Sequence, residues 1–210
     1  MKNWQIDLIF MMKDFEKERV SEIIEKMYLN TDPFKISTTY RKVHNISDQS
    51  FTYGEILPRK FLDILDLVDF GPDSIFYDLG SGSGKAVLVT SLYKNPKKAI
   101  GIEYIPDLVE LSRKILEKLE NYLGYKLNVE FVNNDIKNCD FSDGNVIFFH
   151  ATCAKEDLMK DFLEKTLKLK KGSKIIIVTK RLESSHLRLL YTNLHQFSWG
   201  EGTVRIYERI

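Results

Sequence analysis

The chain has 210 residues, of which 43% are hydrophobic and 29% charged, and its 31 basic and 30 acidic side chains leave a formal net charge of +1. This apolar content can fill a core, which argues against a disordered chain, and no run reaches the roughly 18 apolar residues that span a bilayer. Near-neutral charge argues against strong nucleic-acid binding, which draws on excess lysine and arginine. The two cysteines, Cys139 and Cys153, provide no disulfide framework and fit a reducing compartment. We therefore expect a soluble cytoplasmic protein, or a nuclear one if its source is eukaryotic.

The first quarter of the chain predicts a helix followed by a long irregular segment. Residues 13–29 carry apolar side chains at helical spacing until an Asn and an Asp-Pro pair stop them. Residues 31–55 are polar, β-branched and aromatic without a sustained period, and so long a stretch is typical of a functional lid. We therefore divide the chain into residues 1–55, an N-terminal helix and a cofactor or substrate lid, and residues 56–210, the main domain.

Helical and strand-like patterns alternate over the rest of the chain. An amphipathic helix covers residues 61–68 and ends at a Gly-Pro pair. After it, β-branched and aromatic runs are separated by helical patterns, which predicts a parallel sheet covered on both faces. The expected strands lie near residues 74–80, 98–104, 128–135, 144–150 and 173–180. The expected helices lie near residues 85–93, 106–122, 155–169 and 182–190.

The C-terminal end breaks this alternation. Residues 194–199 and 203–210 read as strands separated only by Gly200-Glu201-Gly202, a connection too short for a crossover helix. The sequence therefore predicts an α/β fold with a doubly wound, Rossmann-like and mostly parallel sheet. The sheet closes with an antiparallel C-terminal hairpin, and the chain carries an N-terminal helical extension.

A glycine-rich segment carries the strongest chemical signal. Asp78 ends the first expected strand, and Gly80, Gly82 and Gly84 follow it in a GxGxG pattern that leads into a helix. Glycines in such a turn let a ligand touch the backbone. Glu103 ends the next strand, 23 residues past Gly80, where a carboxylate can accept hydrogen bonds from both ribose hydroxyls of an adenosine. We therefore expect a ligand that contains adenosine.

The spacing of the glycines distinguishes between adenosine cofactors. Dinucleotide loops read GxGxxG, and a P-loop has four residues between its glycines and a Ser or Thr after its lysine. This loop instead looks like the S-adenosylmethionine loop of class I methyltransferases. Asp135, at the end of the third strand, can accept a hydrogen bond from an adenine amino group, with a turn or helix-cap role as the alternative. We expect S-adenosylmethionine as cofactor and S-adenosylhomocysteine as product, and a dinucleotide oxidoreductase remains an alternative.

A more specific resemblance rests on short motifs from about Ser50 to the C-terminus. The motifs are Tyr53-Gly54-Glu55, FYDLGSGSGK, GIE, NVIFFH and Ser198-Trp199. Together they resemble the disruptor of telomeric silencing family, histone lysine methyltransferases built on the class I fold instead of the SET fold. The resemblance implies that Tyr53 and Glu55 lie on a loop that covers the cofactor. It also implies that Gly80, Gly82 and Lys85 line the methionine side, Glu103 the ribose, and Asp135 with Ile136 the adenine.

On the acceptor side, the resemblance implies a narrow lysine channel with one wall from the segment Phe148-Phe149-His150 and another from Trp199. Desolvation in an apolar channel favours the neutral amine that methyl transfer needs. The catalytic candidates are therefore Tyr53, Phe148, His150 and Trp199, although strand alternation places at least one of the two phenylalanines in the core. His150 is placed to hydrogen-bond the acceptor or to take its proton, and the alternative is a strand-end histidine bonded to backbone.

The family pattern is retained better on the cofactor side than on the acceptor side. The family has a pair of asparagines where this chain has His150-Ala151, and a phenylalanine where it has Thr152. Its serine and tyrosine after the tryptophan are replaced here by Arg205 and Ile206.

The leading prediction is an S-adenosylmethionine-dependent methyltransferase that acts on an accessible lysine of a histone-like protein. One alternative is a class I methyltransferase acting on a small molecule or RNA, and another is a methyltransferase-like binding module with altered acceptor residues. No metal site is expected, because His150 and Cys153 have no second ligand pair at metal spacing.

Overall fold

The structure is a computed structural model that describes residues 3–48 and 53–210, with side chains described from residue 11 onward. Residues 49–52, which belong to the predicted lid and include the start of the motif-bearing region, lie outside the described residues. None of the helices in the described ranges combines the length and hydropathy that a bilayer span requires.

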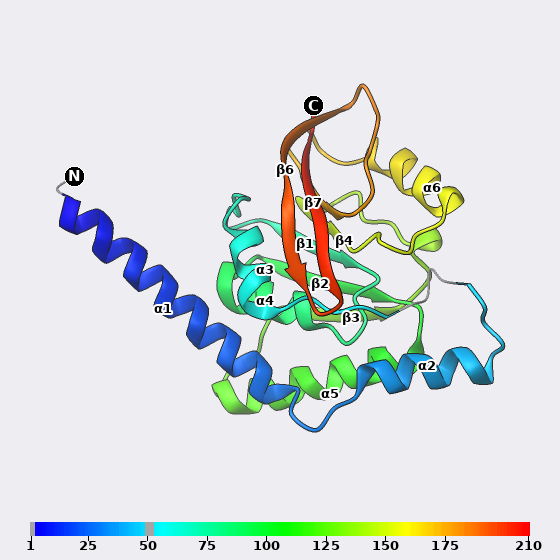
Figure 1. The fold of residues 1–210 in the computed structure, drawn as a ribbon, viewed down its shortest axis with the longest axis horizontal. Helices are drawn as coiled ribbons and strands as arrows, with labels where there is room; N and C mark the ends of the chain where they lie inside the picture. Colours follow the sequence, from blue (N-terminus) through cyan, green and yellow to red (C-terminus); the bar gives the residue numbers. More distant parts are fainter. Residues whose placement is uncertain (1–2, 49–52) are drawn as a thin grey trace.

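Within the described residues, seven strands form one sheet in the order β3-β2-β1-β4-β5-β7-β6 (Figure 1). Strands β1 to β5 pair in parallel, and β7 pairs antiparallel with both β5 and β6. This confirms the predicted α/β sheet with its antiparallel C-terminal hairpin. The strands are β1 (Ile75–Leu79), β2 (Lys98–Glu103), β3 (Val129–Asn133), β4 (Val146–Phe149), β5 (Lys174–Val178), β6 (Leu187–Phe197) and β7 (Gly200–Arg209).

Helices cover both faces of the sheet, because the central strands are apolar on both faces. In β4, Phe148 joins the core formed with α1, α3, α4 and α5, whereas Ile147 and Phe149 join the core formed with α6. The described helices are α1 (Asn3–Met27), α2 (Pro33–Val43), α3 (Pro58–Leu65), α4 (Lys85–Lys94), α5 (Pro106–Leu123), α6 (Glu156–Thr166) and the short 3-10 helix η2 (Ile136–Asn138).

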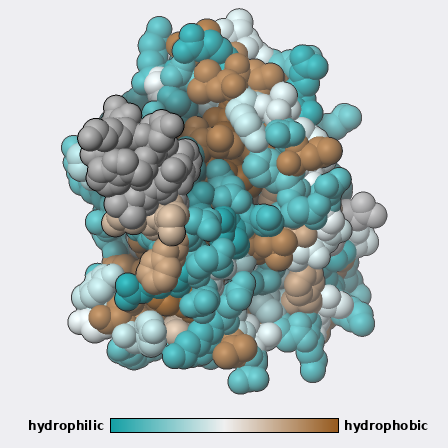
Figure 2. All heavy atoms as spheres, turned by 60° about the vertical axis from the view of Figure 1, so that its left-hand side comes forward, coloured by the Kyte–Doolittle hydropathy of each residue, from teal (hydrophilic) through white to brown (hydrophobic). Residues whose placement is uncertain are grey.

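Helix α1 starts about ten residues before the predicted helix and extends away from the sheet (Figure 1). Its last turns pack into the core, and the Lys17 ammonium lies 2.8 Å from the carboxylates of both Asp63 and Asp66 near α3. Before this anchor, Met11 and Phe15 are exposed. Figure 2, which brings this side forward, shows mostly hydrophilic side chains with hydrophobic ones in scattered groups.

Two of the predicted elements were wrong. Residues 31–55, which were predicted to be irregular, contain α2, and the Asp-Pro pair that was interpreted as a stop signal stands at the start of this helix. Pro33 occupies the first turn and the Asp32 side chain accepts the backbone N–H of Lys35 at 2.9 Å, which caps the helix. The helix predicted over residues 182–190 is absent, because β6 begins at Leu187 and pairs with β7.

The hairpin turn also differs from the prediction. Ser198 and Trp199 form the turn between the strands, whereas Gly200 to Gly202 belong to β7. Trp199 is therefore presented at the tip of a turn, which lets its indole reach the edge of the site described next.

Candidate functional site

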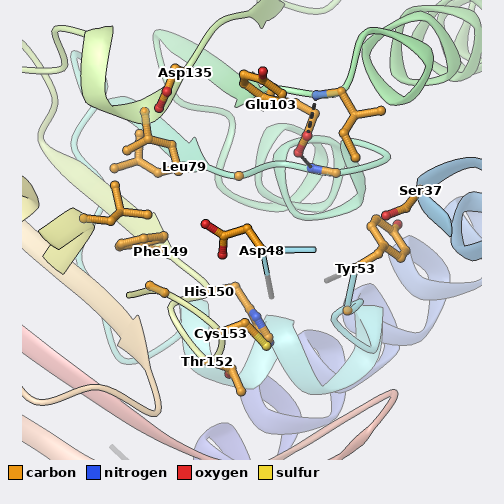
Figure 3. A pocket seen from close by; sticks show the side chains of 18 of the residues that line it. Ser37, Asp48, Tyr53, Leu79, Glu103, Asp135, Phe149, His150, Thr152 and Cys153 are labelled. Atoms are coloured by element: carbon orange, nitrogen blue, oxygen red, sulfur yellow. Dashed lines mark hydrogen bonds between the residues drawn. The ribbon is translucent and has the colours of Figure 1, made fainter. Parts of the chain in front are cut away.

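A cavity of about 430 Å³ opens where β1, β2 and β4 end, on the side expected for ligand binding in an open α/β sheet (Figure 3). It is lined by backbone of the glycine loop, by the ends of the strands and by residues from α2 and the segment after it. Of the predicted site residues, the cavity walls include Tyr53, Gly80, Gly82, Glu103, Asp135, Ile136, His150 and Trp199. Four other predicted residues, Glu55, Asp78, Gly84 and Lys85, lie behind these walls.

The glycine loop turns sharply from β1 into α4. Gly80, Gly82 and Gly84 have φ values of +80°, +55° and +82°, a backbone conformation that favours glycine. A Cβ on Gly84 would lie 2.5 Å from the Phe131 ring, so this glycine allows α4 to pack closely against β3. A Cβ on Gly82 would lie 2.5 Å from the Tyr53 ring, which places that ring directly over the loop.

Glu103 holds the loop through its carboxylate. One oxygen accepts the backbone N–H of Gly82 and the other accepts that of Ile105, both at 2.8 Å (Figure 3). Burial raises the pKa of Glu103, while the backbone N–H groups of Ile105, Gly82 and Tyr104 oppose the rise. Because a carboxylate has about four lone-pair sites, these donors leave Glu103 able to accept a further hydrogen bond.

The other two predicted acids occupy different environments. Asp78 is buried beneath the loop, and burial together with the charge of Glu103 raises its pKa well above the usual range. Asp135 lies on the cavity wall and its side chain caps η2 by accepting the backbone N–H of Lys137 at 2.9 Å. The cap role considered for Asp135 is therefore present, and its second oxygen is not used by that bond.

A polar network joins the segment after residue 52 to the glycine loop. The Tyr53 hydroxyl donates to Glu55 at 2.5 Å and lies within hydrogen-bond distance, 2.8 Å, of the Ser83 hydroxyl. Lys85, at the start of α4, forms an ion pair with Glu55 at 2.5 Å, and both side chains are mostly buried. Glu55 and Lys85 therefore satisfy one another behind the loop, and Tyr53 is the member of the network that reaches the cavity.

The same segment is bound to the C-terminal hairpin. The Ser198 backbone N–H donates to the Glu55 carbonyl, and the Glu55 N–H donates to the Ser198 hydroxyl, both at 3.1 Å. Ile56 also forms an isolated antiparallel bridge with Phe197. These contacts hold residues 53–56 beside the hairpin turn and close that side of the cavity.

The wall on this side is aromatic and uncharged. The Trp199 indole N–H donates to His150 Nε2 at 3.2 Å, and the Phe197 and Trp199 rings stack with centroids 5.4 Å apart. Desolvation lowers the pKa of His150 to about 4, so the imidazole is neutral at pH 7. Gly54 lies against this pair, since a Cβ there would be 3.1 Å from the Trp199 ring.

The structure does not bring Phe148 to the cavity. Phe148 is buried on the opposite face of β4 and packs against Phe61, with ring centroids 4.8 Å apart. Phe149 lines the cavity instead and also contacts Phe162 of α6. Period-2 alternation fixes that only one of these adjacent side chains faces the cavity.

Several residues of the site were missed by the sequence analysis. Ser83 links Tyr53 to the loop, and its place inside the GxGxG pattern was the available signal. Asp48 and Lys155 line the cavity and form an ion pair at 2.7 Å. No local pattern connects these two residues, because they come from segments about a hundred residues apart.

Comparison with protein families identifies one model that matches most of the chain. The model of the histone methylation protein DOT1 matches residues 33–199. A Caenorhabditis elegans protein named histone-lysine N-methyltransferase, H3 lysine-79 specific, is 30% identical over 158 residues, covering 70% of this chain and 17% of that protein. A Kluyveromyces lactis protein of the same name is 33% identical over 146 residues, covering 62% of this chain and 24% of that protein. The chain thus spans less than a quarter of the length of these relatives.

Solved structures share the fold at lower sequence identity. TrmN from Thermus thermophilus has a TM-score of 0.63 at 18% identity, covering 81% of this chain and 53% of that chain. An RNA methyltransferase from Salinibacter ruber in complex with S-adenosyl-L-homocysteine has a TM-score of 0.51 at 22% identity, covering 70% of this chain and 88% of that chain. At these identities the likeness concerns the fold alone, and it confirms the class I methyltransferase fold.

Proposed function

Because the chain belongs to the family of the histone methylation protein DOT1, we propose that it transfers a methyl group from S-adenosylmethionine to a lysine ε-amine of a histone-like protein. The observation that carries the proposal is the division of one cavity into two halves. One half presents glycine-loop backbone and the Glu103 carboxylate, and the other presents the neutral pair of His150 and Trp199.

The cofactor half fits an adenosine-containing methyl donor. Beside its bonds to the loop, the Glu103 carboxylate keeps acceptor capacity that suits a ribose hydroxyl. Asp135 and Ile136 line the neighbouring wall, where an adenine would find an acceptor and an apolar contact. Gly80 and Gly82 would leave backbone exposed to the methionine part, with the Tyr53 ring above the loop.

The acceptor half fits a neutral amine. S-adenosylmethionine supplies an electrophilic methyl group on a sulfonium sulfur, and a lysine reacts only after losing its proton. The Trp199 and Phe149 rings would desolvate the incoming side chain and so lower its pKa. His150 would form part of the wall and not act as the base. Its Nε2 already accepts the Trp199 N–H, and a pKa of about 4 makes the imidazole a poor proton acceptor at pH 7.

Calorimetry with S-adenosylhomocysteine tests the cofactor half. We expect Gly82→Arg to abolish binding, because any side chain there meets the Tyr53 ring. Gly124→Arg is the matched control, since Gly124 also has a positive φ of +79° but nothing lies within 4 Å of its Cβ position. Binding that survives Gly82→Arg would contradict the proposed loop contacts.

Labelling with a radioactive methyl donor tests the acceptor half. The purified chain is incubated with core histones, nucleosomes, total RNA and a host lysate in parallel, and mass spectrometry locates the label. Methyl-lysine in the protein fraction is the expected result. Label confined to RNA or to small molecules would exclude a lysine acceptor while keeping the cofactor assignment.

A further inference from the structure

The end of α1 contributes a residue to the glycine loop. Tyr28 follows the last residue of α1, is 8% exposed, and donates its hydroxyl hydrogen to the backbone carbonyl of Ser83 at 2.7 Å. Its ring also lies under the Lys85 ammonium, 4.7 Å from the ring centroid. Tyr28 lies outside residues 33–199, the span that matches the family model.

The bonded carbonyl lies in a turn flanked by two glycines. Ser83 stands between Gly82 and Gly84, both with positive φ. The ladder of α4 starts one residue later, because the Gly84 carbonyl accepts the N–H of Leu88 at 3.1 Å. The Ser83 carbonyl is thus outside the helix ladder. The Tyr28 hydroxyl bonds this carbonyl, and the N–H of the same peptide, on Gly84, donates to the Ser81 carbonyl at 2.8 Å.

Two tyrosines therefore hold the same loop residue. Tyr28 bonds the Ser83 carbonyl, and Tyr53 bonds the Ser83 hydroxyl from the cavity side. The position of Tyr28 is itself fixed by neighbouring elements. Lys118 of α5 donates to the carbonyl of Met27 at 2.8 Å, and Thr31 donates to the carbonyl of Tyr28 at 2.7 Å.

We infer that Tyr28 is a positioning residue for the cofactor, which it reaches through Ser83 and the glycine loop. The inference rests on the proposed function, and it makes the N-terminal helix part of the cofactor site. Because the peptide between Ser83 and Gly84 is already fixed before the cofactor binds, the loop loses less conformational entropy on binding.

The test compares Tyr28→Phe with the wild-type chain by calorimetry with S-adenosylhomocysteine. The variant keeps the ring and its packing but removes one buried hydrogen bond, so we expect the Kd to rise about fivefold. When the fraction found to accept the methyl label is used as substrate, the KM for S-adenosylmethionine should rise by the same factor while kcat changes less than twofold. Hydrogen exchange should be faster in the peptide that contains residues 82–86.

Tyr93→Phe is the matched control. It removes a hydroxyl of the same kind, bonded to Asp66 at 2.8 Å near the other end of α4, and should leave the Kd within twofold of wild type. A Tyr28→Phe chain with wild-type affinity and wild-type exchange over 82–86 would overturn the inference while the proposed function stands. A wild-type chain that does not bind S-adenosylhomocysteine would overturn the proposed function and this inference with it.

Discussion

His150 should make the stability of the folded chain depend on pH between about 4 and 6.5. Desolvation lowers the pKa of this imidazole to about 4, whereas an unfolded histidine has a pKa of about 6.5. Between these values the unfolded chain binds a proton that the folded chain does not. The contribution of His150 to the free energy of unfolding is therefore fully present above pH 6.5 and falls as the pH falls towards 4.

The size of the effect follows from the difference between the two pKa values, each unit of which corresponds to about 1.4 kcal/mol. At pH 5 the linkage equation gives a loss of about 2 kcal/mol relative to pH 8. Urea denaturation at both pH values measures this loss. Other groups titrate in this range, so the quantity to compare is the loss in wild type minus the loss in His150→Gln.

Glutamine is the suitable replacement, because its amide oxygen can accept the Trp199 N–H and it does not titrate. We expect the wild-type chain to lose about 2 kcal/mol more than His150→Gln between pH 8 and pH 5. Equal losses in the two chains would refute the reasoning, since they would show that His150 ionises in the folded protein as easily as in water.

Three further substitutions probe other parts of the structure. Glu103→Gln should weaken S-adenosylhomocysteine binding at least about tenfold by calorimetry. Both carboxylate oxygens accept a backbone N–H, and in glutamine one of them is replaced by an NH₂ group that can only donate. Phe148→Ala should cost about 3–5 kcal/mol in urea denaturation, since the ring is buried against Phe61, and a much smaller loss would place Phe148 outside the core. Lys17→Met should cost about 1–2 kcal/mol by removing two ion pairs, against less than about 0.5 kcal/mol for the exposed pair lost in Lys114→Met, and equal costs would contradict the anchoring of α1.

The parallel part of the sheet was predictable from the sequence because strands β1 to β5 are four to six residues long, and helices α4, α5 and α6 separate most of them. The errors arose where local signals favoured two structures. An Asp-Pro pair can follow the end of one helix or begin the next, and here Asp32 caps α2 while α1 has already ended at Met27. The leucines at the start of β6 suit a helix, and pairing along the whole of β7 overrides that preference.

The candidate site was predictable where it is formed by the glycine-loop backbone and by the ends of the parallel strands. The positions of Gly80, Gly82 and Glu103 follow from the motif and from strand order, because parallel strands end at one edge of the sheet. The contacts of Tyr28 with Ser83 and of Asp48 with Lys155 join distant segments, and no local period encodes them.

The pairing of Glu55 with Ser198 has a consequence for the order of events during synthesis. The two residues are 143 positions apart, and β7 lies between β5 and β6 in the finished sheet. A ribosome therefore releases the glycine loop and its neighbouring helices long before the hairpin, whose turn completes the opposite wall. Nascent chains that end before the turn at Ser198 and Trp199 should present an open half-site, and we expect the complete cavity only after β7 has paired with β6.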